Sequence, residues 1–131
     1  MSVLIKGGRI VTAADSTVAD VFIEGERVSL IGRSLDVEAD TVIDATGKLV
    51  LPGAIDPHTH LDMPFGGTVT IDDFTSGQTA AAFGGTTCHI DFAIQSKGQS
   101  FSAAIDEWSA KALGSAVIDY GFHIIVTDLE E

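Results

Sequence analysis

The sequence is poor in cysteine and in basic side chains. Cys88 is its only cysteine, so no disulfide can form within one chain, which is typical of a reducing compartment. Seven Lys and Arg residues stand against nineteen Asp and Glu residues, which gives a formal net charge of -12. An acidic chain without a basic cluster repels nucleic acid and anionic membranes. We therefore expect neither as a partner, and a small molecule or a cation as the ligand.

Long apolar runs are also missing. No stretch approaches the roughly 20 residues that cross a bilayer. The first residues, MSVLIKGG, lack the basic segment and the apolar run of a secretory signal, so we expect a cytoplasmic protein. Hydrophobic residues nevertheless make up 45% of the 131 residues and charged residues 20%, a composition that buries a core.

The first 52 residues predict a small antiparallel β unit. Short β-rich runs are broken by turns that contain glycine, and residues 21–31 predict a hairpin that turns at Gly25-Glu26. The acidic stretch 34–40 is expected to be a loop. Few large aromatic side chains are available to this unit, so its core is thin, and nothing in it indicates chemistry.

From residue 53 the pattern changes to alternating strands and helices. A helix at 101–113 is capped by Ser100 and carries Glu107 and Lys111 at a spacing that allows an ion pair. The apolar run 86–94 lacks clean alternation, which predicts a strand covered on both faces with Cys88 as an inert core thiol. The other expected elements are a helix at 72–83 and strands at 54–61 and 116–127. Repeated β-α-β units predict a parallel sheet with right-handed crossovers.

Three such strands leave a parallel sheet with open edges. A closed barrel of eight βα units takes roughly 250 residues. We therefore interpret the sequence as the front of a longer chain, truncated at Glu131. The fold class that follows is α/β.

A histidine pair lies at the end of the first of these strands, in GAIDPHTHLDMPFGG (53–67). Side chains two apart on a strand share a face, so Asp56, His58, His60 and Asp62 are predicted to point the same way. The pair precedes a Pro- and Gly-rich loop at the carboxyl end of the strand, where α/β barrels place their active sites. Two imidazoles there indicate a divalent transition metal, zinc above all. A pair with this spacing can also be structural, but its place at a strand end favours the metal.

The segment VIDATGKLVLPGAIDPHTHLD resembles the opening of the amidohydrolase superfamily, with its P-G-x-I-D-x-H-x-H signature. The segments MPFGGTVTIDDFTSGQTAAAFGGTTCHIDFAIQSKGQSFSAAIDEW and AVIDYGFHIIVTD resemble the dihydropyrimidinases and hydantoinases of that superfamily. The resemblance covers essentially the whole chain. It implies the start of a metal-dependent (β/α)8 TIM-type barrel, with its first three βα units at 53–131, preceded by part of a small β-sandwich domain at 1–52.

The resemblance also implies roles for particular residues. His58 and His60 match the two family histidines that hold the more buried metal of a binuclear zinc centre. Met63 and Phe65 fall on a loop whose apolar side chains face the substituent of the substrate ring. No catalytic residue falls within the chain: the carboxylated lysine, two further histidines, the catalytic aspartate and a substrate-binding tyrosine are expected beyond Glu131. Independently, Asp56 is a candidate to orient a metal-bound imidazole, as such rings usually require.

The implied activity is zinc-dependent hydrolysis of the cyclic amide bond of dihydropyrimidines or 5-substituted hydantoins, giving N-carbamoyl amino acids, by a homotetramer. Asp62 stands where dihydroorotases carry an arginine for the substrate carboxylate, which argues against dihydroorotate. Two alternatives stay open: a non-catalytic dihydropyrimidinase-like scaffold or binding protein, and an inactive truncated fragment. The two retained histidines favour the enzyme.

Three further polar residues lie on the predicted strands. His89 and His123 are in mid-strand, and the resemblance assigns neither to the metals. A histidine in such a place is usually packed and hydrogen-bonded, which is what we expect of both. Asp91, two residues after His89, is open to two interpretations: a residue near the metal ligands at a barrel mouth, or a cap at the end of a strand.

Overall fold

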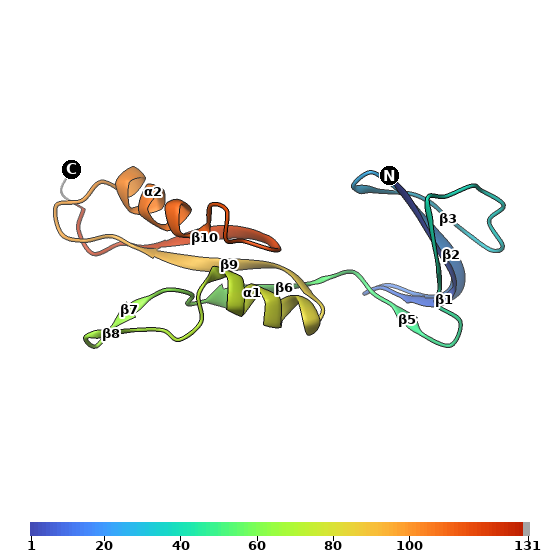
Figure 1. The fold of residues 1–131 in the computed structure, drawn as a ribbon, viewed down its shortest axis with the longest axis horizontal. Helices are drawn as coiled ribbons and strands as arrows, with labels where there is room; N and C mark the ends of the chain where they lie inside the picture. The colour runs from blue at the N-terminus through green and yellow to red at the C-terminus, as the bar shows by residue number, and fades with distance from the viewer. Residues whose placement is uncertain (130–131) are drawn as a thin grey trace. The chain divides into compact units, whose positions relative to one another are not determined.

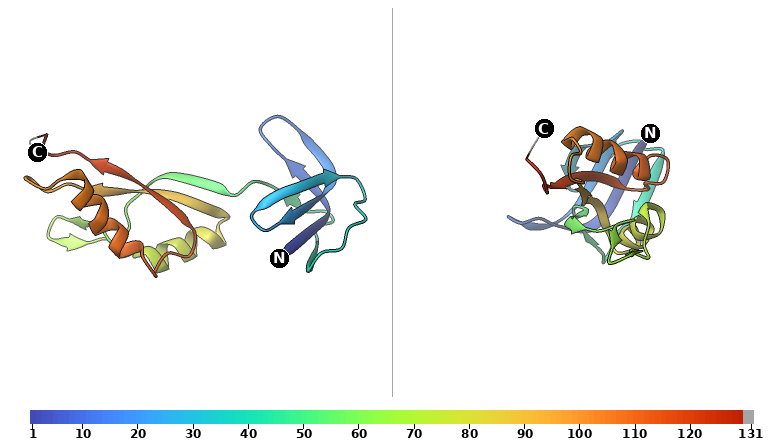
Figure 2. Two further views of the ribbon diagram at one scale, coloured as in Figure 1. Left: turned by 90° about the horizontal axis from the view of Figure 1, so that it is seen from above. Right: turned by 90° about the vertical axis from the view of Figure 1, so that its left-hand side faces the viewer.

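The computed structural model describes residues 1–129 (Figures 1 and 2). The chain divides into two compact units, Met1–Pro52 and Gly53–Glu131. Among the described residues, no helix is long and apolar enough to cross a membrane. The first unit is a β-sheet and the second is an α/β unit, so the α/β class is confirmed for the chain, whereas a closed barrel is not present in the described residues.

The first unit is a five-stranded sheet with the order β3-β2-β1-β4, in which β5 also pairs with β1. The predicted hairpin is confirmed, since Glu24 and Arg27 face each other across a turn whose Gly25 has a φ of 59°. The prediction that the unit is antiparallel is wrong, because β4 and β5 run parallel to β1. After β3 the chain crosses to the edge of β1 that β2 does not occupy. There β4 pairs with β1 and runs in the same direction. The strands are β1 (Ser2–Val11), β2 (Ser16–Glu24), β3 (Arg27–Gly32), β4 (Thr41–Asp44) and β5 (Leu49–Val50).

A buried carboxylate holds this unit together beside a small apolar core. Asp20 is only 4% exposed, and its two oxygens accept the backbone N–H groups of Gly7 at 2.8 Å and Leu35 at 2.9 Å. Gly7 has a φ of 69° and lies where the pairing of β1 with β2 shifts register. The N–H of Gly7 and that of Leu35 stabilise the charged form, so the pKa of Asp20 is lowered although burial opposes this.

The second unit is built on a parallel sheet with the strand order β10-β9-β6, as predicted. Both helices lie on one side of this sheet, and they pack onto β9 and β10 (Figure 2). A short hairpin of two strands follows β6. The elements are β6 (Ala54–Thr59), β7 (Pro64–Phe65), β8 (Thr68–Val69), α1 (Phe74–Phe83), β9 (Thr86–Ile94), α2 (Phe101–Ala112) and β10 (Asp119–Ile125).

The helix ends follow from their local sequences. Asp73 and Ser76 exchange hydrogen bonds between side chain and backbone at the start of α1, which forms a capping box. Gly85, with a φ of 90°, takes the left-handed conformation that ends this helix. At α2 the hydroxyl of Ser100 accepts the N–H of Ala103 at 3.2 Å, so the predicted cap is confirmed.

The core lies between the two helices and the sheet. Phe74 of α1 and Trp108 of α2 are each 1% exposed and share one cluster with Ala93 of β9. The predicted ion pair between Glu107 and Lys111 is not formed. The Nζ of Lys111 donates to the carbonyl of Asp62 at 2.8 Å and lies 4.0 Å from the centre of the Trp108 ring, because the end of β6 is within reach of α2.

Burial along β9 alternates, which the sequence did not predict. His89, Asp91 and Ala93 are buried beneath the helices, and the residues between them are half-buried on the opposite face. The prediction that both faces of β9 are covered is therefore wrong for the described residues, since both helices pack on the face that carries Ala93. Cys88 belongs to the half-buried face and not to the core.

Candidate metal centre

A bulge in β6 decides which way its side chains point. Asp56 pairs with His89 of β9, whereas Thr59 pairs with Asp91, so three steps along β6 match two steps along β9. Pro57 lies in this irregular stretch, where a residue without an N–H costs no ladder hydrogen bond. The bulge resets the alternation of side chains that a regular strand would have.

The bulge separates Asp56 from the histidines. Asp56 and Thr59 line a hollow beside α1 together with the buried His89. The rings of His58 and His60 instead contact Phe92, on the opposite face of β9. The prediction of one shared face is therefore wrong for Asp56. Asp62 lies beyond the strand with a φ of 53°, so the alternation of β6 does not set the direction of its side chain.

The two histidines converge as predicted. The Nε2 atoms of His58 and His60 are 3.1 Å apart, and their rings are nearly perpendicular at 86°. Both rings lie against Phe92, with centroid distances of 4.4 and 5.2 Å. Sequence reasoning missed Phe92. The signal for it was available, because strand alternation puts Phe92 on the face opposite His89 and Asp91.

The spacing of the pair fits one metal ion. Two nitrogens that are each about 2.1 Å from a zinc ion at the tetrahedral angle are roughly 3.4 Å apart. The observed 3.1 Å between the two Nε2 atoms is close to this value. Nδ1 of His60 is buried without a hydrogen-bond partner among residues 1–129, although the second nitrogen of a metal-bound imidazole normally has one.

The described residues supply only part of a metal shell. Within positions 1–129, no group of three or more His, Cys, Asp or Glu side chains is arranged to hold a metal ion. Zinc sites in proteins use three or four protein ligands. The pair therefore has the geometry of two ligands of a larger site.

The carboxylate of Asp56 binds the backbone beside the first histidine. It accepts the backbone N–H of His58 at 3.1 Å, and no hydrogen bond joins it to the ring of His58 or His60. This contact stabilises the bulged backbone next to the first histidine. Orientation of a metal-bound ring by Asp56 stays a prediction.

Asp91 of β9 caps the backbone at the end of β6. It is fully buried, and its carboxylate accepts the N–H of Leu61 at 2.9 Å and that of Phe92 at 2.6 Å. Burial raises the pKa of Asp91, and these two hydrogen bonds oppose the rise. Of the two interpretations left open by the sequence, the structure therefore supports a cap at the end of a strand.

The loop after the histidines is tied to its own hairpin. The N–H of Met63 donates to the hydroxyl of Thr70 at 2.9 Å, and the carbonyl of Met63 accepts the N–H of Thr70 at 2.9 Å. Met63 is half-buried, whereas Phe65 on β7 is 74% exposed. Both predicted substrate contacts thus lie in the segment that directly follows the histidine pair.

The other two histidines are hydrogen-bonded, as expected. His89 is 2% exposed and contacts Thr59 and Gln78. His123 is exposed, and its Nε2 donates to the carbonyl of Pro57 at 3.2 Å. The ring of His123 also lies against Phe92, at 4.9 Å between centroids. Neither histidine joins the pair as a ligand.

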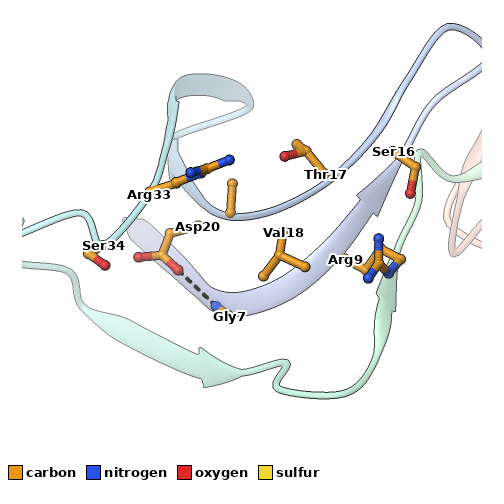
Figure 3. A pocket seen from close by; sticks show the side chains of 9 residues that line it. Gly7, Arg9, Ser16, Thr17, Val18, Asp20, Arg33 and Ser34 are labelled. Atoms are coloured by element: carbon orange, nitrogen blue, oxygen red, sulfur yellow. Dashed lines mark hydrogen bonds between the residues drawn. The ribbon is translucent and has the colours of Figure 1, made fainter.

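A pocket of about 530 Å³ in the first unit is a weaker candidate site. Its walls carry the exposed side chains of Arg9 and Arg33 and the carboxylate of Asp20 (Figure 3). Asp20 is occupied by its hydrogen bonds to Gly7 and Leu35. This carboxylate therefore has a structural role, and the pocket lacks the converging donors of the histidine pair.

Several known proteins resemble the chain over its whole length. It is 57% identical over 131 residues to a D-hydantoinase of Geobacillus stearothermophilus, and 48% identical over 130 residues to a dihydropyrimidinase of Arabidopsis thaliana. These matches cover 100% and 98% of the chain. They cover only 28% and 24% of the two relatives, so the chain spans about a quarter of their length.

A solved structure agrees with these matches. The crystal structure of dihydropyrimidinase from Brevibacillus agri NCHU1002 superposes with a TM-score of 0.96 at 57% identity, over 100% of this chain and 28% of that chain. No protein-family model matches the chain.

Proposed function

The chain is a homologue of the D-hydantoinases and dihydropyrimidinases over about a quarter of their length, and from this premise we propose that its full-length protein is a metal-dependent cyclic amidohydrolase. The proposed reaction opens the ring of 5,6-dihydropyrimidines or 5-substituted hydantoins to give N-carbamoyl amino acids. The observation that carries the proposal is the 3.1 Å approach of the Nε2 atoms of His58 and His60 at the end of a parallel strand. This is where α/β barrels assemble their active sites.

Zinc is the metal that this donor set favours. The Nε2 atoms of the two rings lie 3.1 Å apart, and imidazole nitrogen is a good ligand for zinc. When bound, zinc ions of a binuclear centre would supply polarisation of the amide carbonyl and activation of water. The role of this chain is to hold two imidazoles at a fixed separation. Both rings lie against Phe92, and we propose that this contact limits their rotation.

The loop after β6 is proposed to form one wall of the substrate pocket. Met63 and Phe65 offer apolar surface for the substituent of a cyclic diamide, and the hydrogen bonds between Met63 and Thr70 fix the start of the hairpin. Asp62 adds a negative charge that disfavours a substrate with its own carboxylate. The proposal includes a homotetramer in the cytoplasm, with neither nucleic acid nor membrane as a partner.

The proposal is tested in the full-length protein with His58→Ala and His60→Ala. Each variant removes one of two converging ligands, so zinc content by mass spectrometry and ring opening of dihydrouracil and hydantoin are expected to fall together. His123→Gln is the matched control, because its amide can still donate to the carbonyl of Pro57. Wild-type protein that holds no metal and opens neither ring would favour a scaffold or binding protein instead. Normal zinc content and turnover in the two alanine variants would refute the assignment of the ligands.

A further inference from the structure

A network of hydrogen bonds lies on the face of the sheet opposite to the histidine pair. Nδ1 of His89 is 2.6 Å from Oγ1 of Thr59, and Nε2 of His89 is 2.7 Å from Nε2 of Gln78. Oε1 of Gln78 accepts the backbone N–H groups of Val117 and Ile118, at 2.5 and 3.0 Å. Gln78 is 1% exposed and His89 is 2% exposed, so water does not replace these contacts. This network links α1, β9 and the segment before β10 to Thr59, the residue between His58 and His60.

The hydrogen bonds of this network allow only one assignment of donors and acceptors. Two backbone N–H groups bind one end of the Gln78 amide, so that end is the oxygen and the other end is the NH2 group. The NH2 group must donate to Nε2 of His89, which leaves the proton of a neutral ring on Nδ1. Nδ1–H then donates to Oγ1 of Thr59, whose own hydrogen is directed to the carbonyl of Ile90 at 3.3 Å. Burial lowers the pKa of His89, which keeps the ring neutral as this order requires.

The hydroxyl that accepts from His89 belongs to the residue between the two candidate ligands. Thr59 is the residue that separates His58 from His60, and it lies at the end of the bulge in β6. Its hydroxyl is bound on the α1 side of the sheet, so the neighbouring residues present their rings on the other side. A slip of the bulge would break the contact with His89 and rotate one of the two rings away from the shared point.

We propose that His89, fixed by Gln78, is a positioning residue for the two metal ligands and acts through the hydroxyl of Thr59. This inference rests on the proposed function, since it requires that His58 and His60 bind a metal. His89 itself has no contact with the metal site. Its contribution is to hold the bulge in the one register that brings the two Nε2 atoms to 3.1 Å.

The test compares Thr59→Val with Thr59→Ser in the full-length protein. Valine has the shape of threonine but lacks the hydroxyl, so it leaves Nδ1–H of His89 without an acceptor, whereas serine keeps the hydroxyl. We measure zinc affinity by competition with a chelator and thermal unfolding of the metal-free protein. Loss of a residue that orients a metal ligand weakens metal affinity by about 10- to 100-fold. We expect a loss of that size for Thr59→Val and an affinity close to wild type for Thr59→Ser.

Gln95 offers a matched control for the buried amide. It is 3% exposed and, like Gln78, accepts two backbone N–H groups, those of Thr127 and Asp128. Its NH2 group donates to the carbonyl of Gln99, so it has no contact with β6. Gln78→Leu is expected to lower both thermal stability and zinc affinity. Gln95→Leu is expected to lower thermal stability alone.

The outcomes separate this inference from the proposed function. If Thr59→Val and Gln78→Leu lose stability but bind zinc as tightly as wild type, while His58→Ala loses zinc, the network is only structural and the inference is wrong. If His58→Ala also keeps its zinc, the proposed function itself fails. A neutron structure of the wild-type protein gives a check that needs no variant. It must show hydrogen on Nδ1 of His89 and none on Nε2, and the reverse arrangement would overturn the inference.

Discussion

The carboxylate of Asp91 accepts the backbone N–H of Leu61 at 2.9 Å, one residue after the second histidine of the pair. The same carboxylate accepts the N–H of Phe92 at 2.6 Å, so it joins the end of β6 to the middle of β9. Asp91 is fully buried. The position of His60 therefore depends on an acceptor that another strand supplies.

Removal of that acceptor is expected to destabilise the protein. Asp91→Ala leaves the N–H of Leu61 without its partner, and a buried unpaired polar group costs about 1–3 kcal/mol. Urea unfolding of the metal-free protein measures this loss. Asp106→Ala is the control, because Asp106 is exposed on α2 and its removal should change stability little. Equal stability of the two variants would contradict the role of Asp91 as a cap.

Because of Asp20, we expect the free energy of unfolding to depend on pH in the acid range. The pKa of Asp20 in the folded state is lowered from 3.8, chiefly by the N–H of Gly7, so the unfolded state binds the proton more readily. Its contribution is fully present above about pH 4 and is lost as pH falls through the lower folded pKa. We expect Asp20→Asn to be less stable than wild type at pH 6, with a smaller difference at pH 3. Urea midpoints at the two pH values measure this, and a difference that grows toward pH 3 would contradict the prediction.

Gly77 of α1 is expected to be intolerant of a side chain. Alanine normally stabilises a helix interior relative to glycine by about 1 kcal/mol. A Cβ at position 77 would, however, overlap the side chain of Leu61, next to His60. Overpacking of this kind typically costs about 1–3 kcal/mol, so Gly77→Ala should lower the thermal midpoint. A variant more stable than wild type would show that Leu61 moves aside freely.

Much of the second unit could be predicted from local sequence. Asp73, Gly85 and Ser100 act on the backbone within a few residues of themselves, so the helix ends follow from short-range chemistry. The spacing of His58 and His60 likewise sufficed to predict that their rings share a face. The parallel order of the sheet followed from the alternation of strands and helices.

The errors arose where pairing between distant residues decides the outcome. The alternation rule placed Asp56 with the histidines, but the register of β6 against β9 contains a bulge that no local pattern marks unambiguously. The support of both rings by Phe92 depends on the same register. In the first unit, the parallel entry of β4 beside β1 depends on where the loop after β3 crosses the sheet. These features belong to tertiary pairing and not to propensity.

Substitutions of Phe92 test whether its ring supports the two imidazoles or only contributes to the packing of β9. Its ring lies 4.4 Å from that of His58 and 5.2 Å from that of His60, on the half-buried face of β9. Phe92→Ala frees both imidazoles to rotate, so we expect zinc affinity to fall by about 10-fold in a chelator competition. Phe92→Tyr keeps the ring and should bind zinc as wild type does. Ile94→Ala is the matched control, because Ile94 is half-buried on the same strand and packs against the core cluster, and it should lower stability without weakening zinc. If Ile94→Ala weakens zinc as much as Phe92→Ala, then general loosening of β9 accounts for the effect and the aromatic support does not.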